Sequence, residues 1–166
     1  LIASEPSGRF VDALAISPTR ELASQIQKEC EQLITFLKPK LSTLVVFGGT
    51  NVQADVRAFR SRVPNVLVAT PGRLIDLMTN HNLLPLFERL RVLIFDEADQ
   101  LLEQGFRPDV ERILGHLQSS KATRQTLLFS ATLPGDVMQV AKIAAKPSVN
   151  LVDTVGEEEA THMHVQ

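Results

Sequence analysis

The chain has little cysteine, little net charge and no long hydrophobic run. Its single cysteine, Cys30, permits no disulfide within the chain and no Cys-x-x-Cys site, which favours a reducing intracellular compartment without choosing between cytoplasm, nucleus and organelle. The formal net charge of −2 excludes a polycation, so any contact with nucleic acid must be local and geometric. No apolar stretch approaches the roughly 20 residues of a membrane helix, and no secretory or transit pattern is present, so no membrane contact is expected.

The 166 residues, of which 44% are hydrophobic, can form one domain-sized core. Short apolar runs, each expected to be a strand, cover residues 11–16, 44–47, 66–69, 92–95, 126–129 and 149–152. Amphipathic stretches lie between them at 51–61, 71–79, 107–117 and 134–145, and an earlier one carries the apolar stripe Leu22, Ile26, Cys30, Leu33 and Leu37. On that stripe Cys30 is expected to fill the core. This alternation predicts an α/β fold with a mostly parallel sheet and helices on both faces.

The most informative segment reads Val-Leu-Ile-Phe-Asp-Glu-Ala-Asp over residues 92–99. A buried parallel strand would deliver Asp96 and Glu97 to the carboxyl edge of the sheet, where open α/β folds bind their ligands. In phosphoryl-transfer sites of this kind the Asp holds Mg²⁺ and a neighbouring residue orients or activates water. The alternative is a strand followed by an acidic first helical turn.

One pattern occurs twice: an apolar strand is followed by a hydroxyl residue, Pro, any residue and Arg. The two copies are residues 17–20 and 70–73. Ser17 and Thr70 are each expected to cap a helix with Pro at its first position. An Arg in the first turn opposes the helix macrodipole, so either an external anion or a fixed internal carboxylate should satisfy it. Helix N-termini, hydroxyls and Arg together suit a row of phosphates.

Two further strand ends carry small residues. Gly48 and Gly49 allow either a close approach of backbone to a ligand or a tight turn. The following segment carries Arg57, Arg60 and Arg62, interpreted as a solvated helix face. Ser130 and Thr132 could hydrogen-bond a carboxylate such as Asp99, and the absence of a G-x-S-x-G elbow argues against a hydrolase triad.

Five segments then occur in the order and spacing of one family: Pro-Thr-Arg-Glu-Leu-Ala (18–23), Gly-Gly (48–49), Thr-Pro-Gly-Arg (70–73), Asp-Glu-Ala-Asp (96–99) and Ser-Ala-Thr (130–132). Across nearly all of its length the chain resembles the first RecA-like domain of DEAD-box RNA helicases. The resemblance implies that Asp96 helps to hold Mg²⁺ through water and that Glu97 is the catalytic base for ATP hydrolysis. It implies that Asp99, Ser130 and Thr132 couple hydrolysis to strand separation. The residues it assigns to the RNA sugar–phosphate backbone are Pro18, Thr19, Arg20, Glu21, Gly48, Gly49, Thr70, Pro71, Gly72 and Arg73.

The family's P-loop is not in this sequence, because no Lys follows a Gly and no G-x-x-x-x-G-K-[ST] exists. We therefore expect a RecA-like sheet that lacks its P-loop strand, over residues 1–155, followed by the start of a linker (156–166) to a second RecA-like domain. The first residue, Leu1, is not Met, which also predicts a piece of a longer protein. Unpaired interior strand groups would cost about 1–3 kcal/mol each, so the piece alone is expected to be marginally stable and inactive.

Three functions are compatible with these observations. The first is a fragment of an ATP-dependent RNA helicase that uses ATP and Mg²⁺ to remodel RNA duplexes. The second is an RNA-binding scaffold without a nucleotide site, against which the presence of both Asp96 and Glu97 argues. A DNA translocase would explain the acidic pair but not the two hydroxyl-Pro-x-Arg segments. His162 and His164 are interpreted as part of a solvated tail.

Overall fold

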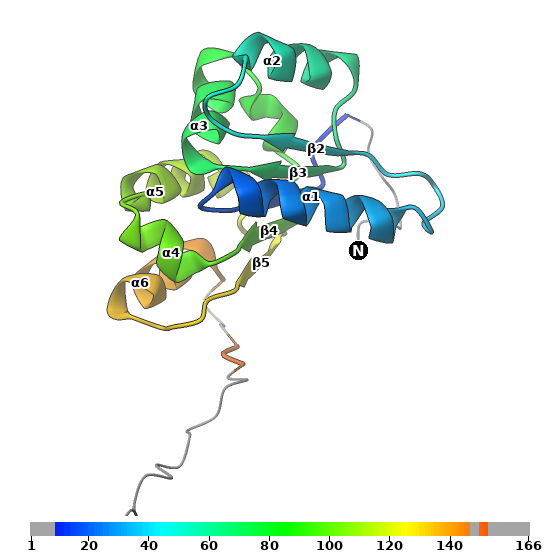
Figure 1. Ribbon diagram of the computed structural model, residues 1–166. Helices are drawn as coiled ribbons and strands as arrows, with labels where there is room; N and C mark the ends of the chain where they lie inside the picture. Colours follow the sequence, from blue (N-terminus) through cyan, green and yellow to red (C-terminus); the bar gives the residue numbers. More distant parts are fainter. Residues whose placement is uncertain (1–8, 147–149, 153–166) are drawn as a thin grey trace, which may run out of the picture.

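A sheet of five short parallel strands forms the centre of the molecule (Figure 1). The structure, a computed structural model, describes residues 9–146 and 150–152. The strands are β1 (Ala13–Ile16), β2 (Thr43–Val46), β3 (Val66–Ala69), β4 (Val92–Phe95) and β5 (Gln125–Leu128). They pair in parallel in the order β2-β3-β1-β4-β5, so the predicted α/β class is confirmed.

The helices cover both faces of the sheet. They are α1 (Arg20–Ile34), α2 (Val52–Ser61), α3 (Pro71–Asn80), α4 (Ala98–Glu103), α5 (Arg107–His116) and α6 (Gly135–Ala144), with 3₁₀ turns η1 (Leu84–Phe87) and η2 (Gln118–Ser120). Side chains alternate along β1: Leu14 and Ile16 join the large core under α2, α3, α5 and α6, whereas Ala15 joins a small cluster under α1. Figure 1 shows α1 in front of the strands. Within the described residues, no helix is both long enough and apolar enough to span a bilayer.

The last predicted strand is absent from the described part of that segment. Residues 150–152 have no strand structure, and residue 149 lies outside the described residues. β5 pairs only with β4 and forms an edge of the sheet. In the family that the chain resembles, a P-loop strand lies between β5 and the strand predicted at 149–152, and this sequence has no P-loop. Without that neighbour, residues 150–152 have no adjacent strand with which to pair.

The apolar stripe of α1 is only partly buried. Leu33 is 72% exposed and Leu37 lies beyond the end of the helix, so the stripe does not belong wholly to the core. Cys30 is half-buried rather than core filler. It lines an apolar groove of about 410 Å³ between α1 and the sheet, together with side chains such as Val68 and Ile94. Burial, and then the neighbouring Glu31, raise the pKa of the Cys30 thiol, which is therefore protonated at neutral pH.

Arg124, at the start of β5, is a buried cation that forms no ion pair within the described part of the chain. Its guanidinium donates to the carbonyl oxygens of Leu117 and of Ala144, the latter at 3.2 Å. It also donates to the hydroxyls of Ser120 and Thr126, each at 3.2 Å. The two carbonyls lie at the C-terminal ends of α5 and α6, where the helix dipole is negative. Burial lowers the pKa of Arg124, and these helix ends offset part of that cost.

Candidate functional site

The candidate residues gather at the carboxyl edge of the sheet. Register pairs Ile16 with Ala69 and with Phe95, so the segments that follow β1, β3 and β4 emerge side by side. Val46 pairs with Ala69, and Phe95 with Leu128, which brings the Gly48–Gly49 turn and the Ser130 loop to the same edge. The sequence-based prediction of a shared edge is therefore confirmed.

The two hydroxyl-Pro-x-Arg segments begin their helices differently. In the first, the cap is Thr19, whose hydroxyl accepts a hydrogen bond from the Leu22 backbone N–H at 3.2 Å. The prediction of Ser17 as cap is wrong: its hydroxyl is buried, with no hydrogen-bond partner in the described structure. In the second segment Thr70 is the cap and Pro71 opens the helix, as predicted, although the Thr70 side chain makes no capping bond. The difference follows from the third residue, which is Thr in one copy and Gly72, without a capping side chain, in the other.

Arg20 is the exposed cation of this edge. It is the first residue of α1, and no carboxylate in the described structure lies within ion-pair distance of its guanidinium. The guanidinium lies against Gly49, whose φ is +83°. A Cβ at Gly49 would stand 2.5 Å from Arg20 Nη2 and 2.8 Å from Nη1. The left-handed backbone favours glycine here, and a Cβ would in addition push the exposed Arg20 guanidinium aside.

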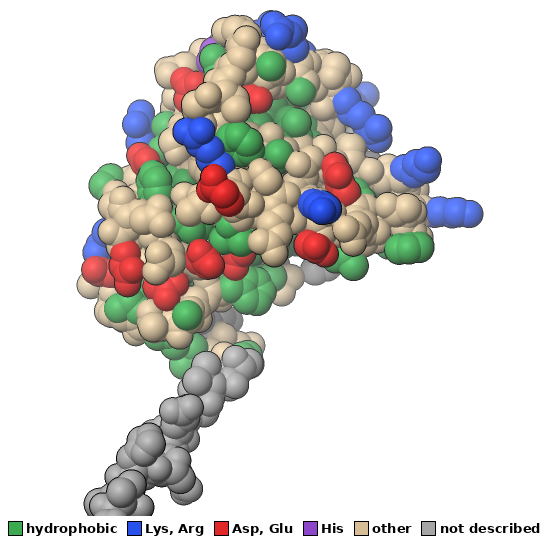
Figure 2. All heavy atoms as spheres, in the orientation of Figure 1, with side chains coloured by type: hydrophobic (Ala, Val, Ile, Leu, Met, Phe, Trp, Pro, Cys, Tyr) green, Lys and Arg blue, Asp and Glu red, His purple; other side chains and the backbone are tan. Residues whose placement is uncertain are grey.

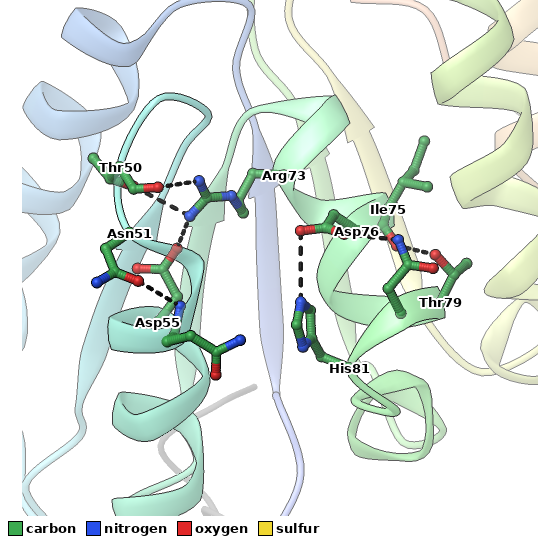
Figure 3. Close-up of polar contacts among 10 residues, drawn as sticks. Thr50, Asn51, Asp55, Arg73, Ile75, Asp76, Thr79 and His81 are labelled. Carbon is green, nitrogen blue, oxygen red and sulfur yellow. Dashed lines mark hydrogen bonds and ion pairs between the residues drawn. The ribbon is translucent and has the colours of Figure 1, made fainter.

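Arg73, in contrast, is buried and already paired (Figure 3). Its guanidinium forms an ion pair with Asp55 of α2 and donates to the Thr50 carbonyl oxygen at 2.7 Å and to the Thr50 hydroxyl at 3.2 Å. Of the two explanations left open for the arginines, the internal carboxylate is therefore correct for Arg73. The side chain fixes the turn that carries Gly48 and Gly49 to the start of α2.

These residues surround one open pocket of about 610 Å³. Its lining contains most of the residues predicted to contact RNA: Pro18, Thr19, Arg20, Glu21, Gly48, Thr70, Gly72 and Arg73. Gly49 touches it through Arg20, and Pro71 is buried beneath it. Asp76 and Phe106 also line the pocket and were not predicted. Asp76 stands one helical turn after Gly72, a spacing that could have identified it; no local pattern marks Phe106.

Asp96 and Glu97 occupy the turn between β4 and α4. Asp96 is half-buried, and its Oδ1 accepts the Glu97 backbone N–H at 3.2 Å. Glu97 has φ +48° and ψ +55°, a left-handed conformation that costs a non-glycine residue about 1 kcal/mol or more. Its side chain is exposed. Backbone strain of this kind is common at functional positions, and the sequence pattern did not predict it.

Asp99, Ser130 and Thr132 form one hydrogen-bonded network. Asp99 Oδ2 accepts the Thr132 hydroxyl at 3.0 Å and the Thr132 backbone N–H at 3.2 Å. The Ser130 hydroxyl accepts the Asp99 backbone N–H at 3.2 Å and donates to the Thr132 carbonyl oxygen at 2.6 Å. The predicted contact between Asp99 and the hydroxyl residues is confirmed, and it ties α4 to the loop after β5.

This network makes the folding stability depend on pH in the acidic range. Burial raises the pKa of the Asp99 carboxyl, but hydrogen bonds from Thr132, Ser130 and nearby backbone N–H groups outweigh it and hold the pKa below its ordinary value of 3.8. The ionised carboxylate therefore stabilises the folded state fully above that value, and the contribution is lost as pH falls through the lower, folded-state pKa. We expect Asp99→Asn to reduce the acid dependence of unfolding below about pH 4. Urea unfolding across that pH range measures it; an unchanged acid dependence would contradict this prediction.

Metal ligands are few at this edge. Within the described residues there is no group of three or more His, Cys, Asp or Glu side chains that could hold a metal ion by themselves. His162 and His164 lie outside the described residues. Any hard cation at Asp96 would have to take most of its ligands from water or from a bound molecule.

Comparison with known proteins identifies the family. The model of the DEAD/DEAH box helicase family matches residues 5–140, which is more than half of the chain. The mitochondrial ATP-dependent RNA helicase MSS116 of Phaeosphaeria nodorum is 40% identical over 96% of this chain and 29% of its own length. The DEAD-box ATP-dependent RNA helicase 26 of Oryza sativa subsp. japonica is 41% identical over 99% of this chain and 30% of its own length. The chain thus spans about three tenths of these relatives.

Solved structures agree. Yeast Prp28, a DEAD-box splicing factor, superimposes with a TM-score of 0.75 at 32% identity, over 82% of this chain and 31% of that one. Mss116p bound to single-stranded RNA and AMP-PNP gives a TM-score of 0.74 at 35% identity, over 86% and 29%. With the five motifs at one edge of a RecA-like sheet, these matches lead to one conclusion. The chain belongs to the DEAD/DEAH box helicase family.

Proposed function

We infer that this chain is part of an ATP-dependent RNA helicase, in which it binds the RNA backbone and supplies the acidic residues for ATP hydrolysis. Residues 1–155 form part of the first RecA-like domain, and residues 156–166 begin the linker to a second one. The observation that carries the proposal is the shared edge: an exposed Arg20 lines an open pocket at the same edge of the sheet as an exposed Glu97 in a strained turn. The RNA and AMP-PNP bound to the related Mss116p support it.

The pocket at the starts of α1 and α3 suits a sugar–phosphate backbone. Arg20 offers an exposed guanidinium, while the helix starts at Thr19 and Thr70 point their first backbone N–H groups toward the same edge. Contacts of this kind recognise phosphate and ribose without reading bases. They explain how a chain of net charge −2 can bind RNA. Arg73 acts here as a positioning residue, because its own charge is neutralised by Asp55.

Asp96 and Glu97 suit the binding of Mg²⁺ and the hydrolysis of ATP. Mg²⁺ in phosphoryl-transfer sites is commonly held by one or two carboxylates together with water and substrate phosphates, and half-buried Asp96 fits that limited role. When bound, Mg²⁺ would neutralise charge on the phosphates. The exposed Glu97 carboxylate would accept a proton from an attacking water.

The Asp99–Ser130–Thr132 network would couple ATP hydrolysis to strand separation. It joins the first turn of α4, next to Glu97, to the loop that follows β5. A shift of α4 on hydrolysis would therefore move that loop, at whose edge we propose the second domain docks. The P-loop and second domain are not in this sequence, so we expect the chain alone to be inactive.

The test is RNA binding by the full-length protein carrying Gly49→Ala. We expect the affinity for single-stranded RNA to fall about tenfold, since the new Cβ displaces Arg20 and strains the turn, together worth about 1.4 kcal/mol. Gly115→Ala is the control, because Gly115 lies on α5 outside the pocket and a Cβ there meets nothing within 4 Å. Fluorescence anisotropy with a labelled RNA measures both. Equal affinities for the two variants would refute this assignment of the pocket.

A further inference from the structure

A strip of exposed basic side chains lies outside the pocket. The basic strip consists of Lys38, Lys40, Arg57, Arg60 and Arg62, all of them exposed. Figure 2 shows Lys and Arg side chains along the upper right of the molecule, over α2 and the loop between α1 and β2, with no acidic side chain between them. For a chain of net charge −2, this is a local concentration of one sign.

The structure explains why this surface has no acids. Asp55 is the only Asp or Glu between Glu31 and Asp76, and it faces inward to Arg73. The buried side of α2 is made of Val56 and Phe59. The outer side of α2 is therefore left to Gln53, Arg57 and Arg60, which follow each other at spacings of four and three residues.

No counter-charge neutralises the strip within the described structure. None of its five side chains forms an ion pair or a side-chain hydrogen bond there. On neighbouring α1, the Glu31 carboxylate accepts the Thr43 hydroxyl at 3.0 Å and does not reach the lysines. The favourable position of cations near a helix C-terminus would explain Arg60 and Arg62, but not Arg57, Lys38 or Lys40.

The two halves of the strip are adjacent. The Asn65 backbone N–H donates to the Ser42 carbonyl oxygen at 3.0 Å, and the Ser42 N–H donates to Asn65 Oδ1 at 3.0 Å. These bonds hold the chain just after Arg62 beside the chain just after Lys40. The lysines of the α1–β2 loop and the arginines of α2 therefore belong to one continuous surface.

The strip is also continuous with the pocket. Arg73, which lines the pocket, binds Thr50, and Asn51 and α2 follow; α2 runs about 15 Å from the carboxyl edge toward the amino edge of the sheet. Along this path the outer face of α2 presents Arg57 and Arg60, then Arg62. Phe36, two residues before Lys38 in the loop between α1 and β2, is 88% exposed. Cations that follow a backbone, with an exposed aromatic ring on which a base can stack, are typical of surfaces for single-stranded nucleic acid.

We propose that the basic strip is a second contact surface for single-stranded RNA, which receives the phosphates of the strand where it leaves the pocket along α2. The strip extends the RNA path from the carboxyl edge to the amino edge of the sheet, and it rests on the proposed RNA binding of the pocket. Its contacts are with phosphates, so they raise affinity without adding sequence preference.

The test is the salt dependence of RNA binding by the full-length protein. A variant with Gln at all five strip positions should bind a homopolymeric uridine RNA more weakly. The slope of log K against log salt should fall in magnitude by about 0.7 for each phosphate that the strip no longer neutralises. The matched control replaces five cations on other elements by Gln: Lys28, Arg112, Lys121, Lys142 and Lys146. It carries the same net charge, and its slope should stay close to that of the unmodified protein.

The outcomes separate this proposal from the previous one. An unchanged salt slope in the strip variant, or an equal fall of the slope in the control variant, would overturn the proposal. It would also be overturned if the strip variant kept its RNA binding but lost binding to polyglutamate, a probe for an acidic protein partner. If the strip variant loses affinity while Gly49→Ala does not, the pocket assignment fails and with it the continuous path from pocket to strip, although the strip itself contacts RNA. Single surface substitutions usually change stability little, and thermal melting of each variant verifies that it is folded.

Discussion

Replacing Glu97 by Gln should lower RNA-stimulated ATP hydrolysis by the full-length protein about 10²- to 10⁴-fold, the usual contribution of a general base. The amide has nearly the same shape as the carboxylate but cannot accept a proton from water. Glu97 is exposed and its side chain makes no capping hydrogen bond to α4, so the substitution removes no support from that helix. Affinities for RNA and for a non-hydrolysable ATP analogue should therefore remain within a few-fold of the original. Steady-state phosphate release and equilibrium binding measure the two effects separately.

Glu103→Gln is the control for that experiment. Glu103 is an exposed carboxylate at the other end of α4, hydrogen-bonded to Gln100 at 3.1 Å. Its replacement changes the charge of the same helix by the same amount and should leave the hydrolysis rate nearly unchanged. Retention of most of the activity by Glu97→Gln would rule out Glu97 as the base, whatever its conformation.

Asp55→Ala should destabilise this domain by about 3 kcal/mol, within the range for breaking a buried ion pair. The side chains of Arg73 and Asp55 are only 7% and 15% exposed. Removal of the carboxylate would leave the guanidinium buried with only the neutral oxygens of Thr50 as partners. Because Arg73 also fixes the turn at Gly49, RNA affinity should fall together with stability. Urea-dependent hydrogen exchange of the β3 amides in the full-length protein measures the stability of this domain.

Two further variants make that result interpretable. Gln53→Ala alters an exposed position on the same helix and should change stability by less than about 0.5 kcal/mol. Combining Asp55→Ala with Arg73→Met should cost less than the sum of the two single changes, since no unpaired charge remains in the double variant. Additive costs would mean that the two side chains stabilise the fold independently of each other.

The sequence predicted the strands and the shared edge because both depend on local patterns. Apolar runs of four residues ending in polar or small residues are unambiguous for β3 and β4. Parallel pairing then requires that Asp96 and Thr70 emerge at the same edge. The network of Asp99 with the hydroxyl residues was predictable for the same reason, since the ends of β4 and β5 are neighbours.

The errors came from interactions that depend on distant residues or on small differences between similar segments. Ser17 looked like a cap until Thr19 provided a better one. For Arg73 the sequence left an external anion and an internal carboxylate both open, and only the fold brings Asp55 of another helix to it. The strand expected at 149–152 needs a partner strand, which no local pattern in its own residues can reveal. The left-handed conformation of Glu97 has no propensity signal, because tertiary contacts impose it.

The hydrogen bonds of Arg124 restrict which residues can replace it during evolution. Its planar group links the last carbonyls of two helices and two hydroxyls, a geometry that the single ammonium of lysine cannot reproduce. An apolar residue would remove the buried charge but also the guanidinium donors, leaving the Leu117 carbonyl only the Ser120 hydroxyl and the Ala144 carbonyl only the Thr126 hydroxyl as side-chain donors. Homologous sequences that lack arginine here should therefore also differ at the ends of α5 and α6, so that these three places vary together.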